Sequence, residues 1–149
     1  MTLEELEKRV RAIEEIEEIK KLHHRYINLM DALKYDEVID LFTDDCTSEV
    51  RNSGPKHGKK EIEDIYFKML AARRGTVRND GHLAIQPEIE IIDENTARGT
   101  WLIYMLFSKP VINWVQGKNE CEYKKVNGQW KIHKLKFTRT LASDPSMYP

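Results

Sequence analysis

The amino-acid sequence predicts an α+β fold: a curved antiparallel sheet wraps around a long N-terminal helix, with two shorter helices and an internal pocket. Apolar residues recur every three or four positions through the first half of the chain, which is typical of amphipathic helices. After Arg78 they alternate with polar residues, as in strands that bury one face. Asn127-Gly128 adds the strongest short-range signal for a tight hairpin. A chain of 149 residues fits one domain over 1–149, with a core that needs neither disulfides nor metal.

The periodicity predicts a first helix over residues 1–33. An apolar stripe follows three- and four-residue spacing along it, through Leu3, Leu6, Val10, Ile13, Ile16, Ile19, Leu22, Tyr26, Leu29, Met30 and Leu33. Four glutamates precede two lysines at the spacing of a solvated outer face: Glu14, Glu15, Glu17, Glu18, Lys20 and Lys21. We expect residues 1–16 to form an amphipathic extension whose first turns protrude and pack on a partner subunit.

Two shorter helices are expected before the sheet. Val38, Ile39, Leu41 and Phe42 indicate a short second helix. Thr43-Asp44-Asp45 then predicts a turn, followed by a strand from Cys46 to Val50 and a loop over 52–55. The third helix is predicted from Lys59 to Arg73, with Gly75 ending it.

Alternating residues predict four strands in the second half, over 82–92, 96–107, 112–126 and 129–141, with 142–149 as a loose tail. A two-residue loop at Asn127-Gly128 would pair Tyr123 with Ile132 and Lys125 with Trp130. The four strands would form an antiparallel meander, and its basic residues, such as Lys134, would lie on a solvated face. One long helix cannot cover a curved sheet flatly, so we expect a pocket in the gap, a common position for small-molecule sites.

Composition excludes several classes of protein. With 24 basic and 25 acidic residues the net charge is −1, so no global field attracts nucleic acid or anionic lipid. Cys46 and Cys121 form no paired motif, and we expect two buried thiols in a reduced compartment. No apolar run approaches the ~20 residues that span a bilayer, and the acidic N-terminus is unlike a secretory signal. The prediction is a soluble, cytoplasmic protein whose partners are a small hydrophobic molecule and further copies of itself.

The chain resembles a known family over roughly Glu17 to Arg139. Residues 26–45, which begin Tyr26-Ile-Asn-Leu-Met-Asp31, resemble the first-helix signature of SnoaL-like proteins, members of the nuclear transport factor 2 superfamily with the cystatin-like cone fold. Residues 58–62 are similar to the start of that family's third helix, and Gly81-His82, 89–101 and 127–132 to its strands. Within the superfamily the chain looks closest to the bile-acid 7-alpha-dehydratase branch. The resemblance implies a cone-shaped fold, a deep pocket, acid–base chemistry without a cofactor, and homodimers or homotrimers.

The same resemblance supplies four candidate site residues. The bile-acid branch uses a tyrosine, an aspartate five residues later, a histidine that begins a strand and an arginine on the last strand; Tyr26, Asp31, His82 and Arg139 match them. It implies that His82, oriented by Asp31, removes a proton beside a carbonyl. Tyr26 would stabilise the enolate or protonate the departing hydroxyl, and Arg139 would bind a carboxylate or brace the pocket. Trp101 and Tyr104 are expected to contribute to substrate binding.

The residues themselves leave these roles open. An ideal helix places Tyr26 and Asp31 about 140° apart, so they converge only if a cavity wraps the helix or the helix ends near Asp31. Asp31 could instead face solvent, His82 could be an exposed turn residue, and Tyr26 could belong to the core. Arg139 is in phase with the apolar Leu135 and Phe137, so it points inward and needs an acidic partner or an anionic substrate.

Other chemistries have little support in the sequence. His23 and His24 are adjacent, and no HxxxH or HExxH spacing exists, so we expect no metal site. We expect His57 and His133 on the surface. No nucleophile elbow or phosphate-binding loop is present.

Three functions therefore remain open. The first is a dehydratase-type lyase acting on a steroid- or polyketide-like carbonyl compound. The second is an isomerase or polyketide cyclase that uses the same proton abstraction. The third is a non-catalytic binding or assembly module, in which Asp31 would pair with Arg139 and lie too far from His82 for a hydrogen bond.

Overall fold

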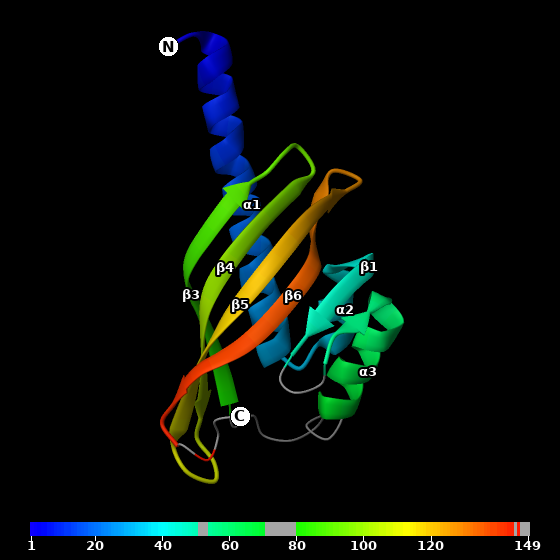
Figure 1. Ribbon diagram of the computed structural model, residues 1–149, viewed down its shortest axis with the longest axis vertical. Coiled ribbons are helices and arrows are strands. Elements are labelled where there is room, and N and C mark those ends of the chain that lie inside the picture. The colour runs from blue at the N-terminus through cyan, green and yellow to red at the C-terminus, as the bar shows by residue number, and fades with distance from the viewer. Residues whose placement is uncertain (51–53, 71–79, 145, 147–149) are drawn as a thin grey trace.

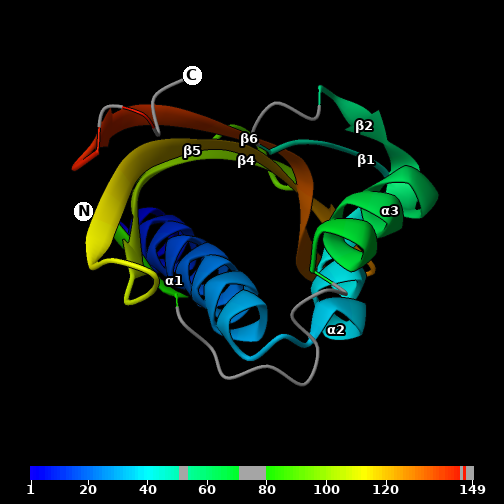
Figure 2. The ribbon, with the colours of Figure 1, turned by 90° about the horizontal axis from the view of Figure 1, so that it is seen from below.

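A computed structural model describes residues 1–50, 54–70, 80–144 and 146. The elements in chain order are α1 (Leu3–Asp31), α2 (Tyr35–Asp40), β1 (Phe42–Glu49), β2 (Lys56–His57), α3 (Gly58–Leu70), β3 (Asp80–Ile91), β4 (Thr96–Phe107), β5 (Asn113–Val126) and β6 (Gln129–Ala142). They form a six-stranded sheet in the order β2-β1-β6-β5-β4-β3. The sheet arches over α1, and α2 and α3 lie together beside the β1 end of the arch (Figures 1 and 2). The predicted α+β architecture is confirmed.

Both ends of α1 are defined by local chemistry. At the start, the Thr2 side chain accepts a hydrogen bond from the Glu5 backbone and the Glu5 carboxylate accepts one from the Thr2 backbone, a capping box. At the other end the helix stops at Asp31, and Leu33 adopts a left-handed conformation with φ of 60° that turns the chain toward α2. The helix therefore ends at Asp31, which is one of the two conditions under which Tyr26 and Asp31 can converge.

The meander of β3 to β6 was predicted correctly. Tyr123 pairs with Ile132 and Lys125 with Trp130, as the hairpin signal required. Asn127 and Gly128 both have positive φ, 50° and 77°, which is the geometry of a type I′ turn whose twist matches the flanking strands.

The first part of the sheet differs from the prediction. The turn expected at Thr43-Asp44-Asp45 was wrong, because these residues lie inside β1, which also takes Phe42 from the expected second helix. β1 runs parallel to β6, pairing Ser48 with Leu135, and β2 adds a short antiparallel edge. Asp44 and Asp45 resemble turn residues in sequence but occupy exposed positions of this strand. The predicted end of the third helix, residues 71–73 with Gly75, and residues 145 and 147–149 of the expected tail lie outside the described residues.

The core fills the concave side of the arch. Trp101, Ile103 and Met105 point inward from β4 and are buried. Gly117 on β5 admits a neighbouring ring, because a Cβ there would lie 2.2 Å from the Phe137 side chain. Cys46 and Cys121 are buried free thiols, as expected. In the part of the chain that the structure covers, no helix is long and apolar enough to cross a bilayer.

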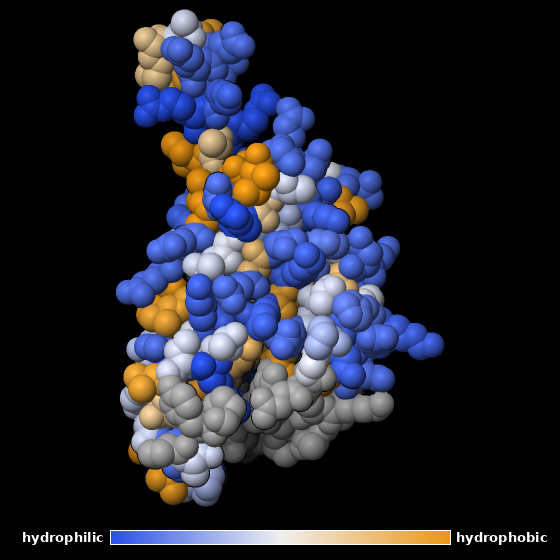
Figure 3. Space-filling model, viewed as in Figure 1, coloured by the Kyte–Doolittle hydropathy of each residue, from blue (hydrophilic) through white to orange (hydrophobic). Residues whose placement is uncertain are grey.

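The outer face of the sheet carries opposite charges on neighbouring strands. The ion pairs join β3 to β4, β5 to β6 and β6 to β1: Arg98–Glu90 at 2.6 Å, Lys134–Glu122 at 3.0 Å and Lys136–Glu49 at 3.6 Å. Figure 3, which views this face, shows broad hydrophilic areas with separate hydrophobic clusters. The lysines of β6 therefore belong to a solvated face, as predicted.

Candidate active site

His82 and Asp31 meet where β3 passes the end of α1. The Nδ1 atom of His82 lies 2.6 Å from Oδ1 of Asp31, and the backbone N–H of His82 donates to Oδ2 over 3.2 Å. The two side chains are 18% and 15% exposed. The backbone N–H and the ring of His82 therefore both bond the Asp31 carboxylate, and these two contacts hold the imidazole in one orientation. A neutral ring that donates from Nδ1 keeps its lone pair on Nε2, the nitrogen that can accept a proton.

His82 lines a small cavity between α1, α3 and the sheet. The cavity volume is about 70 Å³. Most of its wall is apolar, supplied by Ile27, Met30, Leu33, Val50, Ile65, Ile103, Met105, Leu135 and Phe137; its other members are Tyr26, Tyr35, Tyr66, Asp80, His82 and Asn119. An engineered cavity of about 150 Å³ is large enough to bind benzene. This smaller space suits a small molecule or the reacting end of a larger one.

Two tyrosines form a buried pair on the cavity wall. The Tyr26 hydroxyl from α1 lies 3.0 Å from the Tyr66 hydroxyl from α3, and both side chains are almost fully buried. Burial raises the pKa of Tyr66 to about 12 and raises the pKa of Tyr26 well above its ordinary value. Both are therefore neutral phenols at neutral pH. They can donate a hydrogen bond to a substrate oxygen but are poorly suited to act as bases.

A second buried network positions Asn119. His23 is fully buried and stacks on Trp101, with ring centroids 4.3 Å apart. Burial, with a smaller contribution from the charge of His24, lowers the pKa of His23 to about 3, so the ring is neutral. The Tyr123 hydroxyl lies 3.1 Å from its Nδ1, and the Asn119 amide nitrogen lies 3.3 Å from its Nε2. Because Nδ2 of Asn119 is bonded to His23, the amide oxygen is the polar atom of Asn119 that can bind a ligand in the cavity.

The structure brings together only part of the predicted set. Tyr26 and His82 line the cavity, and Asp31 stands behind His82. Arg139 is half-buried on β6, two residues beyond the cavity residue Phe137.

The two predicted aromatic binding residues lie elsewhere. Trp101 is 1% exposed and sits in the core, where its indole N–H donates to Tyr123 over 2.9 Å. Tyr104 lies one residue out of phase with Trp101 and Ile103, on the outer face of the sheet, and accepts a hydrogen bond from Gln116 over 2.6 Å. Neither lines the described cavity.

Sequence reasoning missed three residues of this site. Tyr66 falls within the predicted third helix without any sign of a functional role, and His23 was considered only as one of two adjacent histidines. Asn119 had a detectable signal: it is the polar member of an inward series with Gly117 and Cys121, where burial requires a partner.

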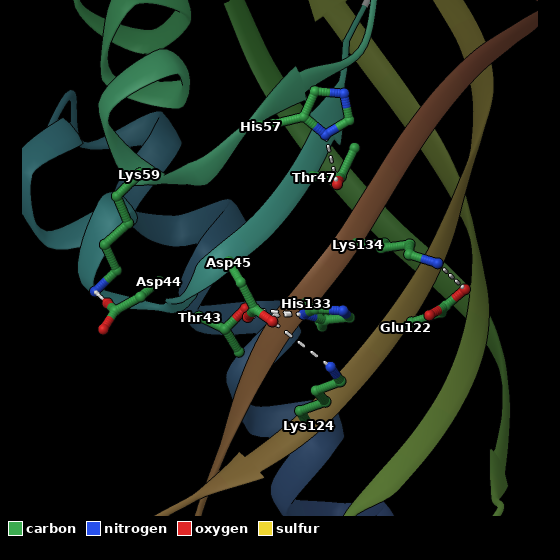
Figure 4. Close-up of polar contacts among 10 residues, drawn as sticks. All are labelled: Thr43, Asp44, Asp45, Thr47, His57, Lys59, Glu122, Lys124, His133 and Lys134. Atoms are coloured by element: carbon green, nitrogen blue, oxygen red, sulfur yellow. Dashed lines mark hydrogen bonds and ion pairs between the residues drawn. The ribbon is translucent and has the colours of Figure 1, made fainter.

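A separate polar cluster joins β1 to β5 and β6 (Figure 4). The Nδ1 atom of His133 lies 3.0 Å from the Thr43 hydroxyl and 3.4 Å from the Asp45 carboxylate, which is 3.8 Å from Lys124. The surface position expected for His133 was wrong, because it is 8% exposed and burial lowers its pKa. His57 is exposed, as expected. Thr43 and Asp45 contact the same ring nitrogen of His133, so these contacts do not pass a proton through the ring from one nitrogen to the other. The cluster therefore links the strands and does not form a proton relay. Across the described ranges, no group of three or more histidine, cysteine or acidic side chains could hold a metal ion.

Comparison with protein families places the chain. The model of the SnoaL-like domain matches residues 11–136. The chain belongs to the SnoaL-like family. No curated protein sequence matches this SnoaL-like chain.

Solved structures with the same fold are distant in sequence. A nuclear transport factor 2-like protein with a cystatin-like fold from Novosphingobium aromaticivorans has a TM-score of 0.80 at 16% identity, covering 97% of this chain and 94% of its own. A candidate scytalone dehydratase from the same organism has 0.77 at 20%, covering 89% of each. A hexachlorocyclohexane dehydrochlorinase from Novosphingobium barchaimii has 0.77 at 14%, covering 94% and 97%. At these identities the likeness establishes the shared SnoaL-like fold.

Proposed function

We propose that this SnoaL-like protein is a cofactor-independent lyase that removes a proton from carbon and expels a leaving group from the neighbouring carbon. The observation that carries the proposal is the 2.6 Å contact between His82 Nδ1 and Asp31 on the wall of an apolar cavity. A non-catalytic module with the alternative arrangement would have kept these two residues apart. The candidate dehydratase and the dehydrochlorinase among the structural relatives support an elimination reaction.

The proton would move to His82. Nε2 takes the proton from the carbon beside a carbonyl and the C–H electron pair becomes an enolate. The enolate then expels the β-hydroxyl as the double bond forms, and that hydroxyl leaves as water with one proton from its surroundings, which the proton held on Nε2 replaces. The imidazolium that results lies against the Asp31 carboxylate, which stabilises its charge without taking the proton. A positioned base of this kind contributes about 10²–10⁴-fold to the rate.

The tyrosine pair would act on the other side of the reaction. As neutral phenols, Tyr26 and Tyr66 can supply one outward hydrogen to the substrate carbonyl oxygen, where negative charge develops, or to the departing hydroxyl. The Asn119 amide oxygen can accept a hydrogen bond from a substrate hydroxyl and so fix its orientation. Arg139, beyond the cavity on β6, would bind a substrate carboxylate.

The proposed substrate class follows from the cavity wall. A mostly apolar cavity of about 70 Å³ suits the reacting end of a steroid- or polyketide-like carbonyl compound, with the remainder outside. Trp101 would contribute indirectly by holding His23.

The test is a turnover assay on a panel of cyclic and aromatic β-hydroxy ketones, read by product mass. Elimination removes one water from the substrate mass, whereas isomerisation or cyclisation without loss of water leaves it unchanged. His82→Gln and Asp31→Asn should lose most of the activity, and His24→Gln, an exposed histidine on the same helix as Asp31, should keep it. Full activity in folded His82→Gln would exclude this mechanism. Tight binding of the panel without any turnover would favour a binding module.

A further inference from the structure

The first turns of α1 stand free of the domain. Figure 1 shows them projecting beyond the end of the sheet, and residues 1–14 are all exposed. Besides Met1, which precedes the helix, four of them are large and apolar: Leu3, Leu6, Val10 and Ile13, with 72%, 43%, 45% and 62% of their surface exposed. We call these four residues the N-terminal stripe. A contiguous apolar row on a projecting helix marks an interaction surface rather than random exposure.

The chain's own sheet cannot cover this stripe. At 100° per residue, the four residues lie within an arc of about 80°, centred roughly 150° away from the mean direction of the five buried residues of α1. The side of the extension that faces the β3–β4 turn is polar or small: Glu4, Glu7, Lys8, Arg11 and Ala12 line the groove there. The apolar side therefore points away from the body that the same helix stabilises.

The spacing within the stripe specifies how it could be covered. Steps of three, four and three residues are the a and d positions of two heptads, with Leu3 and Val10 at a and Leu6 and Ile13 at d. We propose that the N-terminal stripe packs against the same stripe of a second copy of this chain, as a parallel two-helix coiled coil. This proposal is independent of the reaction assigned to the cavity.

Charge decides the orientation. In this register Arg9 occupies position g and Glu14 the following e position. A parallel pair places g of one helix beside the next e of the other, so Arg9 would meet Glu14 of the partner subunit, twice by symmetry. An antiparallel pair would place g beside g and e beside e, which brings like charges together. Within the described part of the chain, neither residue forms an ion pair; Arg9 contacts only the Met1 sulfur at 3.2 Å. Exposed pairs of this kind select geometry more than they add affinity.

The first experiment measures mass in solution by sedimentation equilibrium over a wide range of concentrations of the full chain. The wild type should show reversible association, and Leu6→Glu and Val10→Glu should each weaken it by at least tenfold. Leu141→Glu is the matched control, because Leu141 is a similarly exposed leucine (47%) on the outer face of the sheet. A monomeric wild type would overturn the proposal. So would association that survives both stripe variants or that is lost only in the sheet variant.

The second experiment measures orientation by cross-linking. Leu6→Cys alone should oxidise to a linked dimer, because facing d positions of a parallel pair lie within reach of a disulfide. The native cysteines are buried and should not compete. Arg9→Glu should weaken association, and adding Glu14→Arg should restore it. Cross-linking of Leu3→Cys to Ile13→Cys in a mixture, without a Leu6→Cys dimer, would contradict the parallel arrangement.

Discussion

Mild acid should destabilise the fold through His23. In the native state this ring is fully buried between Trp101, Tyr123 and Asn119, and its pKa is about 3, whereas a free histidine has a pKa of 6.5. Between these two values the unfolded chain binds a proton that the native chain does not. The free energy of unfolding therefore rises with pH in this window, and the stability is lost as the pH falls below 6.5.

The size of the effect follows from how far the pH lies below 6.5, the pKa of a histidine in the unfolded chain. Each pH unit below the unfolded pKa lowers stability by about 1.4 kcal/mol, so one and a half units, from 6.5 to 5, lower it by about 2 kcal/mol. At pH 5 the native ring is still neutral, so the figure does not depend on the exact native pKa. It is a large share of the 5–15 kcal/mol that typically separates native and unfolded domains.

The assay is urea unfolding at pH 7, 6 and 5 for the wild type, His23→Gln and the control His24→Gln, whose histidine is exposed on the same helix. His23→Gln should lose about 2 kcal/mol less than the wild type between pH 7 and 5, whereas His24→Gln should follow the wild type. An equal pH slope in His23→Gln would refute the reasoning. If that variant does not fold, NMR titration of the wild-type His23 ring decides: protonation above pH 5 would contradict the argument.

Three further variants test the site and its packing. Asn119→Leu should destabilise the protein by about 1–3 kcal/mol in urea unfolding, because it leaves His23 without its amide partner, and should raise KM most for hydroxylated substrates. Gly117→Ala should cost about 1–3 kcal/mol by forcing the Phe137 ring aside, and adding Phe137→Leu should recover part of the loss. Tyr26→Phe should lower kcat by about 10²-fold, because it removes the hydrogen bond to the developing charge, and should cost about 1–3 kcal/mol of stability, because it leaves the buried Tyr66 hydroxyl without its partner.

The sheet was largely predictable because local sequence signals specify its strands and the pairing between the last two. Asn127-Gly128 admits one tight turn, and that turn fixed the pairing of Tyr123 with Ile132. β1 was harder, since the acidic pair Asp44-Asp45 has the composition of a turn and only a non-local parallel pairing with β6 makes it a strand.

The site was predictable only through resemblance. Helical spacing separates Tyr26 from Asp31, and no local pattern joins Asp31 to His82 across 51 residues of sequence. The fold joins them because α1 ends at Asp31 beside the start of β3. Side-chain direction was readable for Tyr104, whose phase opposes that of Ile103, but its residue type suggested a binding role.

One uninterrupted helix of 29 residues carries the free N-terminal turns at one end and the Asp31 carboxylate at the other. Because residues 1–14 make little contact with the body, whereas Glu15 bonds Lys125 and Trp130, adding one residue between Glu14 and Glu15 would swing the projecting end through about 100° and lengthen it by ~1.5 Å. Asp31 and the pocket would stay where they are. An insertion or deletion at this point would therefore test the proposed coiled coil separately from the candidate site, because it changes how two stripes could meet and leaves the cavity residues in place.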